Sequence, residues 1–314
     1  MKKILFRRLL MLIPILFGVT FLSFAMMRIA GSDAVLQKTD TSGVALSEEV
    51  IEAQREEMGL DKPFLIQYVN WLGRFLRGDL GESYISGEDV FTEFVSKLPA
   101  TLFLTLTSVL LTVIISIPLG ILAAVKQNRF IDYLIRVCSF IGNSLPNFFV
   151  ALVLMYFFAI RLGVFPVISE GISLRSAALP TLTLAIAMSA KYLRQVRAAV
   201  LDELSKGYVT GAKARGVKFS VTMRKSVLRA ALVTILTLLA LSIGNLLGGT
   251  AIVESIFMWD GVGKLAVDAI NMRDYPVIQA YVVWMALIYV AVNLVTDLTY
   301  SLLDPRIRPG GEDA

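Results

Sequence analysis

Histidine is absent from this chain and cysteine is nearly absent. The 314 residues include no histidine and one cysteine, Cys138. Histidine is the commonest general base of enzymes and the commonest metal ligand of proteins. A single cysteine excludes an intrachain disulfide and a cysteine metal cluster. We therefore expect no catalytic residue, no cofactor-binding residue and no metal ligand in this chain, and we predict that it is not an enzyme.

Charged residues are scarce as well, and hydrophobic residues are in excess. Charged side chains make up 18% of the sequence and hydrophobic ones 56%, whereas soluble domains are about 45–50% apolar. Runs of about 20 apolar residues predict helices that cross a bilayer. The net charge of +5 gathers at the ends of these runs. This placement is typical of a membrane protein and disfavours binding to nucleic acid.

Six apolar stretches predict an all-α polytopic membrane protein with six transmembrane helices. The first stretch follows a basic tail but is longer than a signal-peptide core of about 7–15 residues, so we interpret it as a retained helix. An even number of crossings places both termini on one side of the membrane. The stretches cover residues 9–30, 101–125, 134–160, 177–192, 228–253 and 277–303.

The distribution of charge predicts which side that is. Lys and Arg concentrate in both termini, in 126–136 and in 191–229, whereas 31–98 is rich in Asp and Glu. The positive-inside rule then places both termini in the cytoplasm. The chain divides into a tail and first helix at 1–30, an extracytoplasmic loop at 31–98, a transmembrane core at 99–303 and a cytoplasmic tail at 304–314.

The long loop at 31–98 is expected to contain structure of its own. Ser47 is a suitable cap for a helix that ends at Gly59, and the sequence predicts a turn at 78–81. Between them, residues 64–76 carry Tyr68, Trp71 and Phe75 at helical spacing, which suits a helix on the membrane interface.

No nucleotide-binding loop is present. The nearest candidate, at 261–264, reads Gly-Val-Gly-Lys. Met258 stands where a P-loop has its first glycine, and Leu265 stands where it has the hydroxyl that binds Mg²⁺. We therefore expect this chain to bind no ATP itself.

A basic segment at about 203–220, between the fourth and fifth apolar stretches, is the most informative part of the sequence. It predicts two short helical pieces, 210–214 and a turn after Gly216, with Gly207 and Gly216 as places where the chain bends. We interpret the segment as a docking element for a soluble partner. The alternative is an ordinary basic cytoplasmic loop. Its basic residues are Lys206, Lys213, Arg215, Lys218, Arg224 and Lys225.

This segment resembles the ATPase-coupling segment of bacterial ABC importer permeases, in which Glu-Ala-Ala is followed after three residues by Gly. Thr210, Gly211 and Ala212 stand at the first three places and Gly216 at the last. The match is better to the form Tyr-(Val/Ile)-x-x-Ala-x-Ala-x-Gly of the dipeptide/oligopeptide/nickel branch. The resemblance implies that the coupling residues are Tyr208, Thr210, Gly211, Ala212, Ala214, Arg215 and Gly216.

Motifs along nearly the whole chain resemble the same branch. Ser226, Ala230 and Thr234 depart from it after the coupling segment, and residues 31–34 read Gly-Ser-Asp-Ala where Gly-Asp-Pro is usual. The matching motifs are Gly-Leu-Asp-Lys-Pro at 59–63, Gly-Asp-Leu-Gly-Glu-Ser at 78–83, Leu-Pro-Ala-Thr at 98–101, Ser-Leu-Pro-Asn-Phe at 144–148, Gly-Val-Gly at 261–263, Arg-Asp-Tyr-Pro at 273–276 and Asp-Pro-Arg-Ile-Arg at 304–308.

The resemblance implies one of two permease subunits of an importer in the bacterial inner membrane, with 99–303 as the permease core. It implies a sister permease, two cytoplasmic ATPase subunits that carry ATP and Mg²⁺, and an extracytoplasmic binding protein that delivers a dipeptide or oligopeptide. Import of nickel or a metal chelate by the same architecture stays open. An autonomous channel or secondary transporter is a further alternative, although the apolar stretches carry few of the charges that it would need.

Several helix residues have candidate roles of their own. Asn293 and Asp297 lie one turn apart in the last apolar stretch, and a carboxylate at membrane depth usually faces a wet path or a partner, so both are pore candidates. Gly244 and Gly248 form a GxxxG pattern that favours close helix packing, within the chain or against the sister subunit. Prolines inside apolar stretches can bend helices; here they are Pro118 and Pro146.

Overall fold

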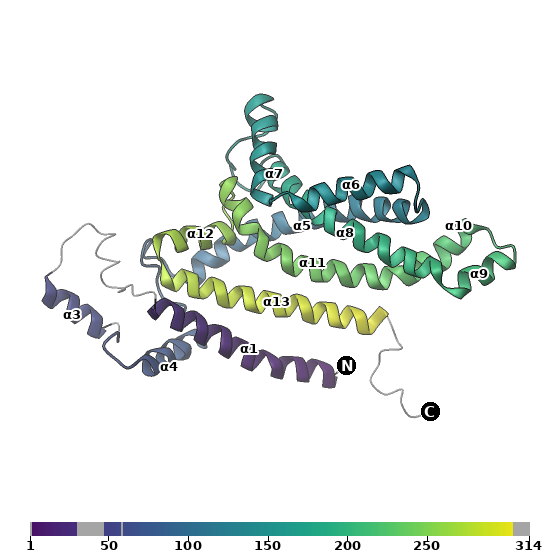
Figure 1. Ribbon diagram of the computed structural model, residues 1–314. Coiled ribbons are helices and arrows are strands. Elements are labelled where there is room, and N and C mark those ends of the chain that lie inside the picture. Colours follow the sequence, from purple (N-terminus) through teal and green to yellow (C-terminus); the bar gives the residue numbers. More distant parts are fainter. Residues whose placement is uncertain (1, 30–46, 58, 304–314) are drawn as a thin grey trace. The chain divides into compact units, whose positions relative to one another are not determined.

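The computed structural model describes residues 2–29, 47–57 and 59–303 (Figure 1). This part of the chain consists of helices and turns, and its one β-bridge, between Glu82 and Asp89, is isolated. The expected all-α class is confirmed. The chain forms two compact units: unit 1 consists of Leu102–Trp259 and Tyr289–Ala314, and unit 2 of Lys2–Thr101 and Asp260–Ile288.

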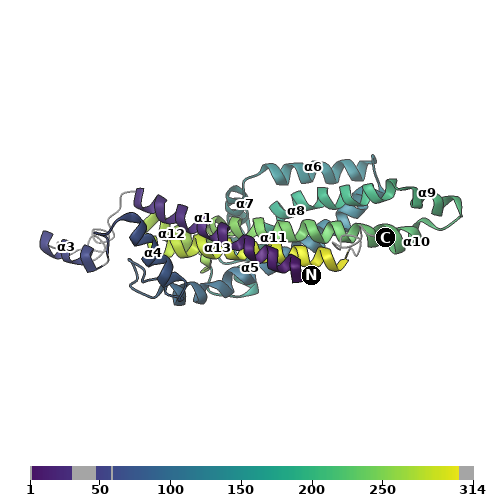
Figure 2. The same cartoon turned by 90° about the horizontal axis from the view of Figure 1, so that it is seen from below.

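A long helix, α8 (Leu174–Ser205), is the centre of unit 1. It packs against α6 (Phe130–Ser144), α7 (Asn147–Leu154) and α11 (Leu228–Ile256), and α6 and α11 lie beside it in Figures 1 and 2. Ser173 caps α8, because its side chain accepts a hydrogen bond from the backbone N–H of Ser176.

Glycines let two other helices approach α8 closely. A Cβ atom at Gly120 in α5 (Val90–Val125) would lie 2.7 Å from Cγ1 of Val196. One at Gly142 in α6 would lie 3.1 Å from Cβ of Ala190. These distances are shorter than ordinary van der Waals contacts. The absence of a side chain at each glycine therefore lets the backbones of α5 and α6 approach α8 closely.

Buried polar contacts fasten α8 to its neighbours. Asp132 of α6 is fully buried, and Nε and Nη2 of Arg197 donate to its two carboxylate oxygens at 2.7 and 2.8 Å. The backbone N–H of Asn128 also donates to this carboxylate. On the other side of α8, the hydroxyl of Tyr192 donates to the carbonyl oxygen of Ile235 in α11 at 2.7 Å. These bonds set the register of the three helices.

A sharp break divides the apolar stretch expected at 134–160. The helix α6 and the pair formed by α7 and the π-helical turn η1 (Met155–Arg161) meet at an angle of 100°. Pro146 lies at the break, and Leu145 before it is extended with φ −84° and ψ 129°, the conformation that steric conflict with a proline ring favours. The stretch is therefore not one straight helix. By contrast, α5 continues through Pro118 without a break.

The number of membrane crossings stays a prediction. Within the described residues, three helices are long and apolar enough to span a bilayer, and a fourth crossing follows if the bent pair counts as one span. The helix α8 is not among them. Its second half carries Lys191, Arg194 and Arg197, which lower its hydropathy.

In unit 2, α4 (Phe64–Phe75) packs its aromatic face onto α1 (Lys2–Ile29). Tyr68 is 3% exposed, its hydroxyl lies 2.9 Å from the hydroxyl of Thr20, and its ring contacts Phe21 and Phe24 edge-on. The helix expected at 64–76 is confirmed. Its aromatic stripe does not lie free for a membrane interface, because α1 offers a matching aromatic surface.

The other elements of the long loop also follow the sequence. The helix α3 (Glu48–Glu57) ends where expected, because Gly59 has a φ of +65° and its N–H donates to the carbonyl of Glu56. The turn at 78–81 is present, with a carboxylate oxygen of Asp79 accepting from the N–H of Gly81 at 2.9 Å.

The second half of unit 2 anchors this loop. Between α12 (Val262–Met272) and α13 (Tyr275–Leu303), Asp274 is 3% exposed and accepts hydrogen bonds from the hydroxyl of Ser83 and the N–H of Tyr84. Below it, Leu80 and Val90 pack with residues of α12 and α13 in one apolar cluster. The loop at 79–89 is therefore a fixed part of the fold.

Candidate functional site

The basic segment forms a helical hairpin at one end of unit 1. It consists of α9 (Gly207–Ala214), a turn, and α10 (Phe219–Thr222), and Figures 1 and 2 show it at the tip beyond α8 and α11. The π-helical turn η2 (Met223–Val227) joins α10 to α11. The two helical pieces expected from the sequence are present. We refer to residues 207–222 as the hairpin.

The turn of the hairpin depends on Gly216. Its φ is +73°, a backbone conformation that is unfavourable for residues other than glycine. The N–H of Gly216 donates to the carbonyl of Lys213, and the N–H of Val217 donates to the carbonyl of Ala212, both at 3.0 Å. This pair of bonds is a Schellman motif that ends α9 and reverses the chain. Gly207 is the first residue of α9 and shows no such φ.

The base of the hairpin is anchored in the core of unit 1. Ala212 is 8% exposed. Val209 packs against a cluster of buried side chains contributed by α5, α8, η2 and α11. The members of the cluster are Ala124, Tyr192, Val196, Val200, Met223, Val227, Ala231 and Ile235. A displacement of the hairpin would therefore be transmitted directly to α8 and α11.

A buried carboxylate holds α9 at a fixed angle to α8. Glu203 is 9% exposed; one of its oxygens accepts from Nζ of Lys206 at 2.6 Å and the other from the hydroxyl of Tyr208 at 3.0 Å. The hydrogen bond to Glu203 raises the pKa of Lys206, and burial together with the same carboxylate raises the pKa of Tyr208. Lys206 is thus engaged within the chain, whereas the sequence suggested a partner group.

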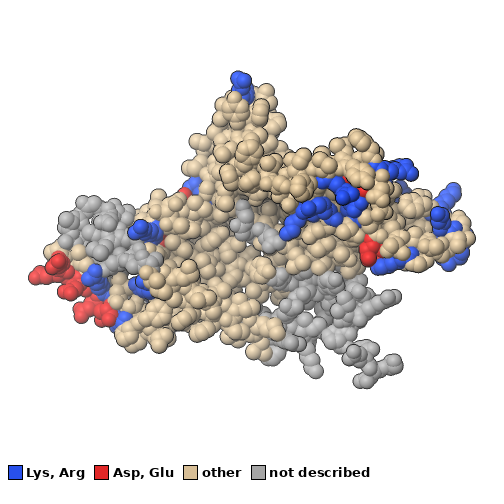
Figure 3. Space-filling view, viewed as in Figure 1, with Lys and Arg blue, Asp and Glu red and all other residues tan. Residues whose placement is uncertain are grey.

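The free face of the hairpin combines apolar and basic side chains. Val217, Phe219 and Val221 are exposed around the turn, by 38%, 53% and 40%. Lysines and arginines gather over this end of unit 1 in Figure 3. The exposed basic residues of the hairpin are Lys213, Arg215 and Lys218. Large apolar groups ringed by cations suit a complementary acidic surface on another protein.

The other predicted residues lie away from the hairpin. A Cβ atom at Gly244 would lie 3.5 Å from the ring of Tyr289 in α13, so α11 and α13 approach closely there. Gly248 belongs to α11, and Asn293 and Asp297 to α13, but their side chains fall outside the described residues, as do 304–314. No group of His, Cys, Asp and Glu suited to a metal ion occurs in the part of the chain that the structure describes.

Comparison with known families identifies the chain. Residues 116–309 match the family described as "Binding-protein-dependent transport system inner membrane component", and residues 1–105 match its N-terminal region. The chain belongs to this family. It is an inner-membrane, multi-pass permease of an ABC importer, a transport subunit without enzymatic activity. Permeases of this family work with ATPase and substrate-binding partners.

Curated relatives match over their whole length. The permease is 39% identical to the oligopeptide transport system permease protein AppB of Bacillus subtilis strain 168, over 98% of this chain and 100% of that protein. It is 37% identical to the glutathione transport system permease protein GsiC of Escherichia coli K12, over 98% of this chain and 99% of that protein.

Solved structures share the fold. A chain of the MetNI methionine ABC transporter in an inward-facing conformation superimposes with a TM-score of 0.58, at 17% identity, over 68% of the permease and 96% of that chain. A chain of an amino acid ABC transporter gives a TM-score of 0.54 at 18% identity, over 67% of the permease and 94% of that chain. At such identities the likeness concerns the fold alone.

The sequence carries little signal for the side chains that hold these elements together. Glu203 had a signal, because it precedes Lys206 and Tyr208 by three and five residues at the end of a helix. Asp274 belongs to a motif noted for resemblance, but nothing in the sequence pairs it with Ser83. Asp132 and Arg197 are 65 residues apart, and only the packing of α6 on α8 brings them together.

Proposed function

We propose that this permease imports short peptides, with ATP hydrolysis in separate subunits as the energy source. The observation that carries this proposal is the 39% identity with an oligopeptide permease over 98% of this chain and 100% of that protein. The match to a glutathione permease supports it, since glutathione is itself a small peptide. Short peptides are the cargo class that we infer.

The proposed assembly has five parts. This permease pairs with a sister permease, two ATPase subunits lie on the cytoplasmic face, and an extracytoplasmic binding protein delivers the peptide. ATP and Mg²⁺ bind to the ATPase subunits and not to this chain. Both termini and the hairpin lie in the cytoplasm, and the loop at 31–98 lies outside, a placement that rests on the distribution of charge.

In this proposal the hairpin is the point where the ATPase acts. Closure of the ATPase pair moves the hairpin, and the buried side chains at its base transmit the movement to α8 and α11. The permease pair then changes from inward-facing to outward-facing, receives the peptide, and returns after hydrolysis. The apolar and basic free face and the carboxylate that fixes α9 support this role.

Uptake by intact cells tests the proposal. Cells that express the whole transporter should accumulate labelled short peptides, and deletion of this permease should abolish that uptake. Accumulation of nickel or a nickel chelate in place of peptide would favour the metal alternative. Uptake by the purified permease alone, without an ATPase subunit or ATP, would instead assign it to the channels or secondary transporters.

A second prediction concerns the last helix. As a proposed pore residue, Asp297 should affect cargo passage more than assembly, because a carboxylate at membrane depth is costly unless it serves a wet path or a partner. We expect Asp297→Asn to lower peptide uptake about tenfold or more while the permease still co-purifies with its sister subunit. A variant that no longer assembles would assign Asp297 to helix packing.

A further inference from the structure

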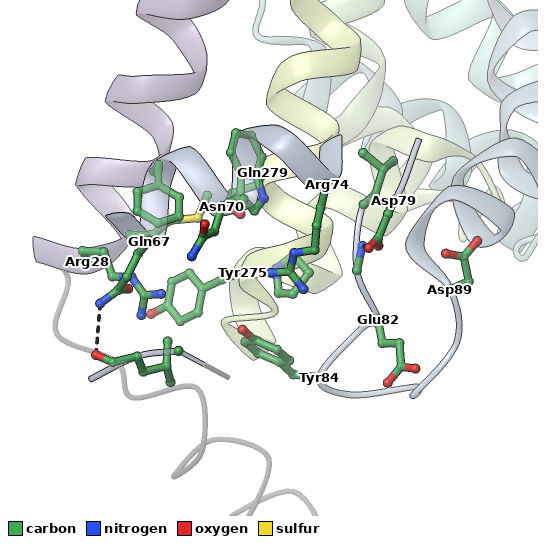
Figure 4. A pocket seen from close by; sticks show the side chains of 18 residues that line it. Arg28, Gln67, Asn70, Arg74, Asp79, Glu82, Tyr84, Asp89, Tyr275 and Gln279 are labelled. Carbon is green, nitrogen blue, oxygen red and sulfur yellow. Dashed lines mark hydrogen bonds between the residues drawn. The ribbon is translucent and has the colours of Figure 1, made fainter. Parts of the chain in front are cut away.

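Unit 2 contains a cavity of about 480 Å³ that none of the proposed roles uses. Its walls come from the end of α1, from α4, from the loop at 79–89 and from the start of α13 (Figure 4). The volume falls within the range of about 300–1,000 Å³ that is usual for small-molecule sites. The wall is rigid on the loop side, because the buried carboxylate of Asp274 holds Ser83 and Tyr84.

The lining carries charges of both signs. Arg28 and Arg74 come from the two helices, whereas Asp79, Glu82 and Asp89 come from the loop (Figure 4). The rings of Tyr84 and Tyr275 lie between the arginine of α1 and the acidic loop (Figure 4). A purely anionic ligand would meet the loop carboxylates, and a purely cationic one would meet the guanidinium groups. A ligand with one charge of each sign suits both walls.

Two of these charged groups are not engaged within the described chain. Asp79 accepts from the N–H of Gly81, and Asp89 accepts from the N–H and hydroxyl of Thr92, which lowers its pKa. By contrast, no hydrogen bond or ion pair within residues 2–29, 47–57 and 59–303 involves the guanidinium of Arg74 or the carboxylate of Glu82. Arg74 and Glu82 are therefore the groups best placed to bind a ligand.

We infer that this cavity binds a short zwitterionic peptide, with Arg74 on the peptide's terminal carboxylate and Glu82 on its terminal ammonium group. Guanidinium forms paired hydrogen bonds with a carboxylate, and such charge-assisted bonds are stronger than neutral ones. The rings of Trp71 and Tyr275 offer apolar surface for the peptide's side chains. The inference rests on peptide import as the proposed function and adds a peptide site in the extracytoplasmic part of the permease itself.

Direct binding tests the inference. The assembled complex of the two permeases and the ATPase subunits, purified without the binding protein, is titrated calorimetrically with trialanine, with trialanine amide and with acetyl-trialanine. We expect each blocked peptide to bind about tenfold more weakly than trialanine, because each lacks one charge-assisted contact. Equal binding of all three peptides, or no binding of trialanine, would overturn the site.

Variants connect each contact to its residue. Arg74→Gln should lower the affinity for trialanine about tenfold, and this variant should bind trialanine and trialanine amide equally well. Glu82→Gln should also lower the affinity for trialanine about tenfold, and this variant should bind trialanine and acetyl-trialanine equally well. Arg74→Lys should keep a preference for the free carboxylate. Arg77→Gln and Glu88→Gln serve as matched controls, because both residues are exposed nearby and do not line the cavity. If a variant lowers the affinities for the free and the blocked peptides by the same factor, the assignment of that residue is contradicted.

Uptake separates this inference from the proposed function. If cells import trialanine but the purified complex fails to bind it, the cavity site is wrong and peptide import stands. If the complex binds trialanine with the expected dependence on Arg74 and cells import no peptide, the site stands and the proposed function is wrong.

Discussion

Ala212→Asp and Gly216→Val are each expected to abolish peptide uptake while the permease remains in the membrane at its normal level. Ala212 is 8% exposed, so an aspartate there would bury a charge without a partner or force α9 away from its seat. Gly216 has a φ of +73° with open space around it. Valine at that position would meet no neighbour, yet the backbone strain of about 1–2 kcal/mol would disrupt the turn.

The assay for these variants combines uptake with two further measurements. Immunoblots of membrane fractions report the amount of permease, and affinity purification reports whether the ATPase subunits remain bound. We expect normal amounts of permease and a loss of bound ATPase, because the changes are confined to one end of unit 1. Ala198→Asp is the matched control: Ala198 is exposed on α8, one turn after exposed Arg194, and should tolerate a polar side chain. Normal uptake in both hairpin variants would refute the docking role.

Removal of Arg197 should cause the largest loss of stability. Arg197→Met would remove both guanidinium hydrogen bonds from the fully buried carboxylate of Asp132 and leave the N–H of Asn128 as its hydrogen-bond donor among the described residues. Breaking such a pair from one side usually costs about 3–5 kcal/mol. For a protein of this size we expect the midpoint of thermal unfolding to fall by about 5–10 °C. Fluorescence-detected size exclusion after heating of the purified complex measures it.

A double variant distinguishes the lost pair from lost packing. Asp132→Leu combined with Arg197→Met removes both charges and should recover most of the lost stability, because the cost comes mainly from the unpaired carboxylate. Arg194→Met is the control, since Arg194 is exposed on the same helix, and it should leave the midpoint nearly unchanged. If the double variant is no more stable than Arg197→Met alone, the side-chain volume of Arg197 matters more than its charge.

Local patterns predicted the local structure well. Gly59 ends α3, 78–81 form a turn, and Gly216 reverses the chain after α9. Each of these outcomes depends on residues only a few positions apart. Most of them follow because glycine adopts the positive φ angles that helix ends and tight turns need. The break at Pro146 has a local cause as well, because the proline ring disfavours a helical conformation of Leu145, although α5 shows at Pro118 that such a residue can also stay within a helix.

Other outcomes required the packing of distant segments. The aromatic residues of α4 suggested a membrane interface, but α1 presents Phe17, Phe21 and Phe24 to them. The sequence therefore revealed the aromatic stripe of α4, but it did not reveal that α1 covers it. Likewise, Arg74 and Glu82 line one cavity with residues of α1 and α13, and Asp274 holds the loop that carries Glu82 in place.

The sequence by itself determined the class of this protein: a helical membrane permease of a binding-protein-dependent importer, without the residues of an enzyme. Composition predicted the helical membrane class, because bilayer insertion depends on runs of apolar residues, and the resemblance of the motifs to importer permeases predicted the family. The tertiary structure alone decided which polar side chains meet. Asp132 pairs with Arg197, and Asp274 pairs with Ser83, across long stretches of the chain, because only the packing of the helices brings these groups within hydrogen-bonding range.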